Sequence, residues 1–204
     1  RLGPIEYIGI SINRYDRLLS AMINWARGRP GLAGLYCPLS ALRELGKLLM
    51  ANDFDLLHVQ TIMMSSIADV VGHVPRVLDF VDSPHLKLTR RACLANPLWR
   101  AALTLEAKLI VEYEGKEATK FDQLMVSSAV DAKFLGVRDR VHVVPTGLRL
   151  QDFPYREGRA TKDIVFVGTM SYSPNIDAVV YFARQVLPRV RKEVPDARFI
   201  IVGD

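Results

Sequence analysis

The sequence predicts an α/β fold with two Rossmann-like domains, the second of which stops after one strand–helix–strand unit. Short apolar runs alternate with longer amphipathic segments, which is typical of a mainly parallel sheet covered by helices on both faces. The alternation is interrupted by a polar stretch, residues 151–163, which has no apolar periodicity. This stretch predicts a linker between a first domain at 1–150 and a second domain at 164–204.

Apolar runs of strand length predict five strands in the first domain. They cover residues 5–10, 55–59, 76–81, 123–126 and 141–144. Helical spacing predicts three helices. Ser128 and Asp131 form a capping-box-like start to a further short helix. The three cover residues 39–50, 62–71 and 98–120. Asn96 and Pro97 supply an N-cap and a first-turn proline for the last of these.

The second domain opens with a fully apolar strand at 164–167. Ser173 and Pro174 then predict the N-cap and the first position of a helix, and residues 199–202 form a second strand. The chain begins with Arg1 and stops directly after this apolar run. We therefore expect a piece of a longer protein, cut inside its second domain.

Composition excludes some classes of protein. Half of the residues are apolar (50%), 24% are charged, and the net charge of +5 is mild, so nucleic acid is not an expected partner. Cys37 and Cys93 are isolated, which indicates reduced thiols in a cytosolic protein. No apolar run approaches the roughly 18 residues that a membrane-spanning helix needs. We therefore expect a cytoplasmic protein.

One segment concentrates positive charge. Lys87, Arg90, Arg91 and Arg100 lie within residues 83–105, which contain no acid and interleave these cations with leucines and a tryptophan. Such a segment, at about residues 85–100, can bind an anionic membrane surface. That would make the protein peripheral at the inner face of the plasma membrane. The alternative is a solvated surface loop with a few buried anchors.

Residues at the ends of the predicted strands are candidates for a site, because open α/β sheets bind ligands beyond the carboxyl ends of their strands. Ser127, Gly147 and Gly168 would lie at such ends, and a helix that starts at Pro174 would point its amide groups at a phosphate. For the glycines the alternative is a plain tight turn.

Asp82 and two histidines complete the set of candidates. Asp82 places a carboxylate just past an apolar strand, with His85 close behind it. Its alternative is an ordinary helix-capping or turn aspartate. His58 ends a predicted strand, where it is either a ligand-facing residue or a histidine with internal partners.

Several stretches of the sequence resemble a known family. Residues 143–153, VVPTGLRLQDF, resemble the interdomain signature of GT-B glycosyltransferases of family 4, VxPNGVDxxxF. Residues 165–179, VFVGTMSYSPNIDAV, look like the opening of the second domain in these enzymes, most of all in the bacterial exopolysaccharide sugar transferases. Residues 186–191 and 195–203 are similar to the continuation of that subgroup.

The resemblance implies a GT-B fold and transfer of a sugar from a nucleotide-sugar to a saccharide or lipid-linked acceptor in polysaccharide biosynthesis. It further implies a retaining reaction that needs no metal and no cofactor. Family members often have a histidine at the position of Asp82, where it contacts the donor sugar. Asp82 is therefore the candidate catalytic residue, with the role of orienting an acceptor or sugar hydroxyl.

The resemblance also implies binding residues. They are His58, His85, Ser127, Thr146 and Gly147 for the substrate, and Gly168, Thr169 and Asn175 for the donor phosphates. Thr146 stands where relatives usually have asparagine. The glutamate pair and the phosphate-binding cations of the family's donor site cannot be identified, so we expect these 204 residues alone to be inactive. Two alternatives stay open: a GT-B-fold sugar-nucleotide epimerase, and a non-catalytic scaffold that keeps the fold.

Overall fold

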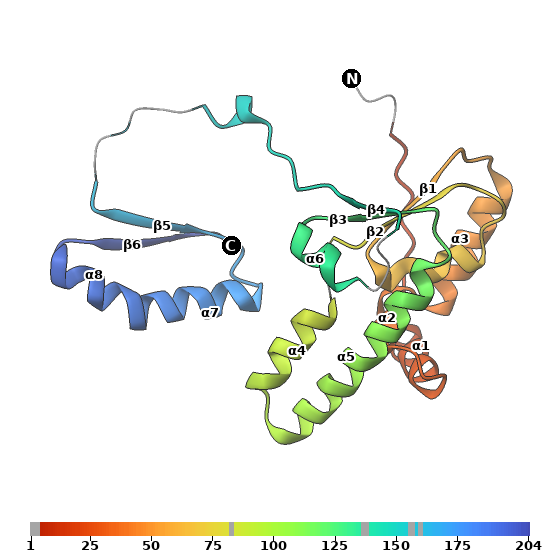
Figure 1. Ribbon diagram of the computed structural model, residues 1–204, viewed down its shortest axis with the longest axis horizontal. Helices are drawn as coiled ribbons and strands as arrows, with labels where there is room; N and C mark the ends of the chain where they lie inside the picture. The colour runs from red at the N-terminus through yellow and green to blue at the C-terminus, as the bar shows by residue number, and fades with distance from the viewer. Residues whose placement is uncertain (1–4, 82–83, 136–138, 155–157, 159–160) are drawn as a thin grey trace. The chain divides into compact units, whose positions relative to one another are not determined.

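The computed structural model describes residues 5–81, 84–135, 139–154, 158 and 161–204, without the side chains of 86, 90, 94 and 134. The chain forms two compact units, residues 1–147 and 148–204. The first unit holds a four-stranded parallel sheet with several helices, and the second holds a two-stranded parallel sheet whose strands are joined by one long helical segment (Figure 1). The protein is therefore of mixed α/β class, as the sequence predicts.

Three helices precede the larger sheet: α1 (Arg14–Ala26), α2 (Gly31–Tyr36) and α3 (Leu39–Ala51). α3 confirms the predicted helix at 39–50, whereas α1 and α2 have no counterpart among the predicted elements. The predicted strand at 5–10 is wrong, because these residues are irregular and mostly exposed. None of the described strands pairs with them, and a strand without a neighbour leaves its backbone hydrogen bonds unmade.

The strands of the larger sheet are short, parallel and arranged in chain order. They are β1 (Leu57–Gln60), β2 (Arg76–Asp79), β3 (Gln123–Val126) and β4 (Val141–Val143). Val59 pairs with Leu78, Leu78 with Leu124, and Leu124 with Val141. The strands predicted in these four places are thus confirmed, with ends that shift by a few residues.

Helical segments connect the strands. A 3-10 helix, η1 (Ile62–Asp69), follows β1, the hairpin of α4 (Pro84–Leu94) and α5 (Pro97–Ala118) follows β2, and α6 (Ala129–Phe134) follows β3. Asn96 caps α5 by accepting a hydrogen bond of 3.0 Å from the Trp99 amide. Ser128 caps α6 in the same way, through the Asp131 amide at 3.1 Å. Both caps were expected from the sequence. For the basic segment at residues 85–100, the sequence leaves a surface loop open as an alternative. In the structure, α4 covers part of this segment.

The described residues bury only one face of this sheet. Val59, Leu78 and Leu124 point into the core and are at most 5% exposed, whereas the alternating side chains of His58 and His142 are exposed. The prediction that helices cover both faces therefore fails for the part of the chain that the structure describes. The strand order gives the reason. Right-handed crossovers between strands that are neighbours in chain order place every connection on the same side.

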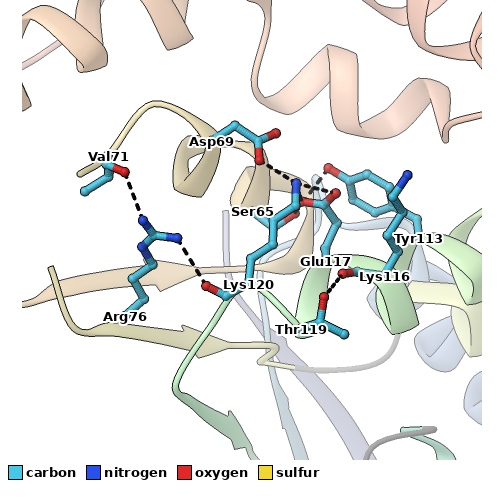
Figure 2. Close-up of polar contacts among 9 residues, drawn as sticks. All are labelled: Ser65, Asp69, Val71, Arg76, Tyr113, Lys116, Glu117, Thr119 and Lys120. Atoms are coloured by element: carbon cyan, nitrogen blue, oxygen red, sulfur yellow. Dashed lines mark hydrogen bonds and ion pairs between the residues drawn. The ribbon is translucent and has the colours of Figure 1, made fainter. Parts of the chain in front are cut away.

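A buried polar cluster fastens η1 to the end of α5 (Figure 2). The carboxylate of Glu117 is fully buried and lies 2.8 Å from the ammonium of Lys120, which also lies 2.6 Å from Asp69. The Ser65 hydroxyl lies 3.0 Å from Glu117 and 3.1 Å from the Tyr113 hydroxyl. Burial, and then the charge of Glu117, raise the pKa of Tyr113 to about 12.

This cluster lies at the amino-terminal edge of the sheet. Arg76, the first residue of β2, donates to the carbonyl oxygens of Lys120 and Val71 at 3.4 and 2.9 Å (Figure 2). Ligands of parallel sheets bind at the opposite, carboxyl-terminal edge. We therefore interpret the cluster as structural, with the task of joining η1, β2 and α5.

A second buried carboxylate joins the N-terminal helices to α5. Glu106 is 6% exposed and accepts hydrogen bonds from the Trp25 indole at 2.5 Å and from the amides of Gly31 and Leu32 at 3.2 and 2.8 Å. Those amides begin α2, where no carbonyl of the helix can satisfy them. The cap of α2 is therefore supplied from α5, 74 residues away along the chain for Leu32.

The second unit is one strand–helix–strand unit. After a short turn, η2 (Leu150–Asp152), it consists of β5 (Asp163–Val167), α7 (Ser173–Tyr181), a π-helical stretch η3 (Phe182–Val186), α8 (Leu187–Glu193) and β6 (Arg198–Val202). Ser173 is the first helical residue and Tyr172 the N-cap, so the predicted cap is one residue out. Pro188 has no amide hydrogen for the carbonyl one turn before it, which accounts for the π-helical bonding ahead of it.

Candidate functional site

The carboxyl ends of the four strands of the first unit meet along one edge, and hydrogen bonds join them beyond the ladder itself. The Thr61 amide donates to the carbonyl of Asp79 at 2.7 Å, which links the end of β1 to that of β2. The Phe80 amide donates to Met125 at 2.9 Å, and the Val144 amide donates to Val126 at 2.8 Å. The backbone just past each strand is therefore fixed where a ligand of such a sheet would bind.

Two residues at this edge have a strained backbone. Thr61, after β1, has φ of 72°, and Val81, after β2, has φ of 62°. Both are β-branched, and such side chains are genuine outliers in the left-handed region. Arg140 also has a positive φ, of 72°, but it is not β-branched and lies at the amino end of β4. Strain of this kind costs about 1–3 kcal/mol a residue and persists only where the surroundings enforce it.

Ser127 and Asp79 hold the strained residue Val81 from two sides. The Ser127 hydroxyl donates to the carbonyl of Val81 at 2.5 Å, and the Val81 amide donates to the carboxylate of Asp79 at 2.9 Å. Ser127 thus lies at the carboxyl end of β3, as predicted from the sequence. Its hydroxyl donates its hydrogen bond to the protein backbone. We interpret it as a positioning residue for the backbone that leads to Asp82. Asp82 itself lies outside the described residues.

His85 is held in the first turn of α4. Its Nδ1 atom lies 3.2 Å from a carboxylate oxygen of Glu114 on α5, and the two side chains are only 15% and 6% exposed. The other carboxylate oxygen of Glu114 is buried and has no hydrogen-bond partner among the described residues. Burial raises the pKa of Glu114, and the partly opposing effect of His85 does not cancel that rise. His85 is therefore partly engaged by a carboxylate that the site candidates did not include.

The remaining candidates of the first unit lie apart from this pair. His58 is the second residue of β1 and does not end the strand as expected; its side chain is on the exposed face of the sheet. Thr146 and Gly147 follow β4 and are exposed. A Cβ atom at Gly147 would meet nothing within 4 Å. Packing among the described residues therefore does not require glycine there.

The three donor-side candidates meet in one loop of the second unit. The Asn175 side-chain amide donates to the carbonyl of Thr169 at 2.9 Å, and a Cβ atom at Gly168 would lie 2.8 Å from the same amide nitrogen. The Gly168 amide donates to Val202 at 2.9 Å. A side chain at Gly168 would thus displace the Asn175 amide, which holds the turn before α7 through its hydrogen bond to Thr169.

Sequence reasoning missed the strained residues and Glu114. Nothing in the sequence distinguishes Thr61 or Val81 from ordinary β-branched residues at strand ends. Glu114 did leave a signal, because Ile110, Tyr113 and Glu114 share the buried helical face at the 3, 4 spacing. A carboxylate on such a stripe predicts either a buried pair or a functional group. The described residues contain no group of three or more His, Cys, Asp or Glu side chains that could hold a metal ion.

No family model, curated protein or solved structure matches this chain. None of the helices within the described ranges is both long and apolar enough to cross a membrane.

Proposed function

We propose that this chain belongs to a GT-B glycosyltransferase of family 4, of the bacterial exopolysaccharide type. Such an enzyme would move a sugar from a nucleotide-sugar to a saccharide or lipid-linked acceptor, with retention and without a metal or cofactor. The first unit would hold the acceptor, and the second would begin the donor-binding domain. The sequence resemblance at 143–153 and 165–179 supports this assignment, as does the parallel-sheet architecture of the first unit.

The observation that carries the proposal is the strained carboxyl edge of the larger sheet. Thr61 and Val81 keep positive φ at adjacent strand ends, and Ser127 and Asp79 hold Val81 there. A fold without a ligand at this edge would gain stability by relaxing such residues, so their retention favours a site. Asp82 follows Val81 directly, at the position where the family resemblance expects contact with the sugar.

The chemistry would rest on positioning and on charge. Glycosyl transfer gains most when donor and acceptor are held in register and when the departing diphosphate is stabilised. In this account Asp82 orients a sugar or acceptor hydroxyl, and Ser127 fixes the backbone before it. Thr146 and Gly147, which follow β4, have exposed backbone that a substrate can contact. The exposed side chain of His58 and the paired His85 are secondary acceptor contacts.

The donor phosphates would bind at the loop that opens α7. Gly168 and Thr169 present backbone at the carboxyl end of β5, and Asn175 fixes the turn through its bond to Thr169. The amide groups that begin α7 then face the phosphates with the positive end of the helix dipole. The segment at 85–100 would bring the protein to the cytoplasmic face of an anionic membrane, where lipid-linked acceptors lie.

A labelled panel of UDP- and GDP-sugars tests the proposal in the chain and in any longer protein that contains it. A transferase converts label into product only when an acceptor is supplied. An epimerase changes the nucleotide-sugar without acceptor, and a scaffold changes nothing. If the longer protein shows either of the last two results across the panel, the proposed function is wrong.

A further inference from the structure

A groove separates α4 from α5 in the first unit. The two helices form a hairpin (Figure 1). A cavity of about 520 Å³ is lined by residues of both helices, most of which have small side chains. Ala92 and Ala107 form its buried floor, at 5% and 7% exposure. Thr89 and Thr104 line its sides, one from each helix. Long side chains at these positions would fill the space. The groove therefore exists because these positions hold the small residues alanine and threonine.

Two cations line the groove. Arg100 and Lys108 both line it, and no aspartate or glutamate does among the described residues. Arg100 is anchored, because its guanidinium donates to the carbonyl oxygens of Ala92 and Ala95 at 3.3 and 3.2 Å. Within the described part of the chain, neither cation lies within 4 Å of a carboxylate. Only Arg100 belongs to the basic segment seen in the sequence; Lys108 lies outside it.

The far end of the groove is formed by the His85–Glu114 pair. His85 lines the groove, and Glu114 lies behind it, with one buried oxygen that has no described partner. Val111 lies at this end and is 51% exposed. The lining therefore combines two cations with an apolar floor and an apolar wall. A molecule complementary to it has a negative head and an apolar chain.

We propose that the α4/α5 groove binds a lipid phosphate, whose head pairs with Arg100 and Lys108 and whose chain lies along Ala92, Ala107 and Val111. The two cations are eight residues apart on α5, which is about 12 Å along a helix axis, so the head lies between the anchored guanidinium of Arg100 and the exposed side chain of Lys108. If the bound lipid phosphate is a lipid-linked acceptor, this inference deepens the proposed function. That one identification rests on the proposed function, whereas binding of the lipid phosphate does not. A free phosphate ion would leave the apolar half of the groove unused.

Cys93 provides a reporter for this site. Its thiol is exposed and lines the groove, whereas Cys37 is buried and burial raises the pKa of the Cys37 thiol. Alkylation by iodoacetamide follows the thiolate and its access, so mass spectrometry can follow Cys93 against Cys37 in the same sample. A ligand in the groove covers Cys93 and slows its reaction.

The experiment compares three probes on the whole chain: dodecyl phosphate, dodecyl maltoside and inorganic phosphate. We expect dodecyl phosphate, below its micellar concentration, to slow alkylation of Cys93 at least fivefold. The other two probes should have little effect. Lys108→Gln should raise the concentration for half-protection about fivefold, while Lys116→Gln, an exposed lysine on the same helix outside the groove lining, should not.

Four outcomes would overturn the proposal: equal protection by dodecyl maltoside, equal protection by inorganic phosphate, no protection by any probe, or equal binding by Lys108→Gln and wild type. Thr104→Phe is a second variant that fills the groove from an exposed position and should abolish protection without unfolding the chain. None of these measurements involves a nucleotide-sugar. In a longer protein that contains this chain, sugar transfer to a water-soluble acceptor without protection of Cys93 would remove this proposal alone, and protection without transfer would remove the proposed function alone.

Discussion

The hydroxyl of Ser127 donates a 2.5 Å hydrogen bond to the carbonyl of Val81, a β-branched residue with φ of 62°. This contact ties the end of β3 to the strained backbone past β2, directly before Asp82. A side chain that fixes such a backbone affects a reaction by placing another group, and small misplacements near reacting atoms are costly. The contact is therefore the first target for mutation.

Replacing Ser127 by alanine should lower kcat/KM for sugar transfer about tenfold. The loss of one hydrogen bond should lower the free energy of unfolding by only about 1 kcal/mol. Ser128→Ala is the matched control. It removes the N-cap of α6, costs about 1 kcal/mol of stability, and should leave transfer unchanged. Equal loss of transfer in both variants would show that the effect of Ser127 is merely one of stability.

Val81→Gly tests the strain itself by urea unfolding. Glycine adopts positive φ without a steric cost, so relief of strain should raise the free energy of unfolding by about 1 kcal/mol. Val143→Gly, at an exposed site in β4 with no positive φ, should lower it by about as much. If Val81→Gly destabilises the protein as strongly as Val143→Gly does, Val81 is not strained. In that case the argument for a site loses its main support.

Glu106→Ala should destabilise the first unit by about 3 kcal/mol. It leaves the buried amide of Gly31, the partly buried amide of Leu32 and the indole of the half-exposed Trp25 without an acceptor, and unsatisfied buried donors cost about 1–3 kcal/mol each. Glu112→Ala is an exposed change on the same helix and should stay within about 0.5 kcal/mol of wild type. Chemical unfolding followed by tryptophan fluorescence measures both. A Glu106→Ala protein as stable as the control would contradict the capping role.

Burial of Glu114 should make stability depend on pH. The folded-state pKa of this carboxyl lies above its usual value of 4.5, so the folded protein binds the proton more tightly than the unfolded chain does. The free energy of unfolding should therefore fall as the pH rises from about 4.5 through the raised pKa. Glu114→Gln removes this component, and unfolding at pH 4.5 and pH 7.5 should show a flatter profile. Glu112→Gln should keep the wild-type profile, and identical profiles for all three proteins would refute the effect.

The elements that the sequence predicts well are those determined by local pattern. β2, β3 and α5 lie where apolar runs, helical spacing and the Asn96 cap place them. The strand expected at residues 5–10 fails because pairing is a property of the neighbouring chain and not of the run itself. The one-sided burial of the sheet likewise depends on strand order, which no single segment specifies.

The candidate site was predictable only in part, for similar reasons. Residues at strand ends, such as Ser127 and Gly168, can be read from the alternation of elements. The positive φ of Val81 depends on contacts from Asp79 and Ser127 and so has no local signature. The groove needs two helices to be packed before Arg100 and Lys108 share a surface. Lys108 therefore stayed outside the basic segment that the sequence singles out.

The most direct test of the central claim is a transfer assay of wild type, Asp82→Asn and Asp53→Asn in the longest available protein that contains this chain. Asp53 is exposed and precedes β1, at the amino-terminal edge of the sheet, so its replacement controls for the loss of one negative charge. The account predicts acceptor-dependent transfer from a nucleotide-sugar, a loss of at least about a hundredfold in kcat with Asp82→Asn, and wild-type transfer with Asp53→Asn. Undiminished turnover by Asp82→Asn, or no transfer by the wild type from any sugar nucleotide supplied, would contradict it.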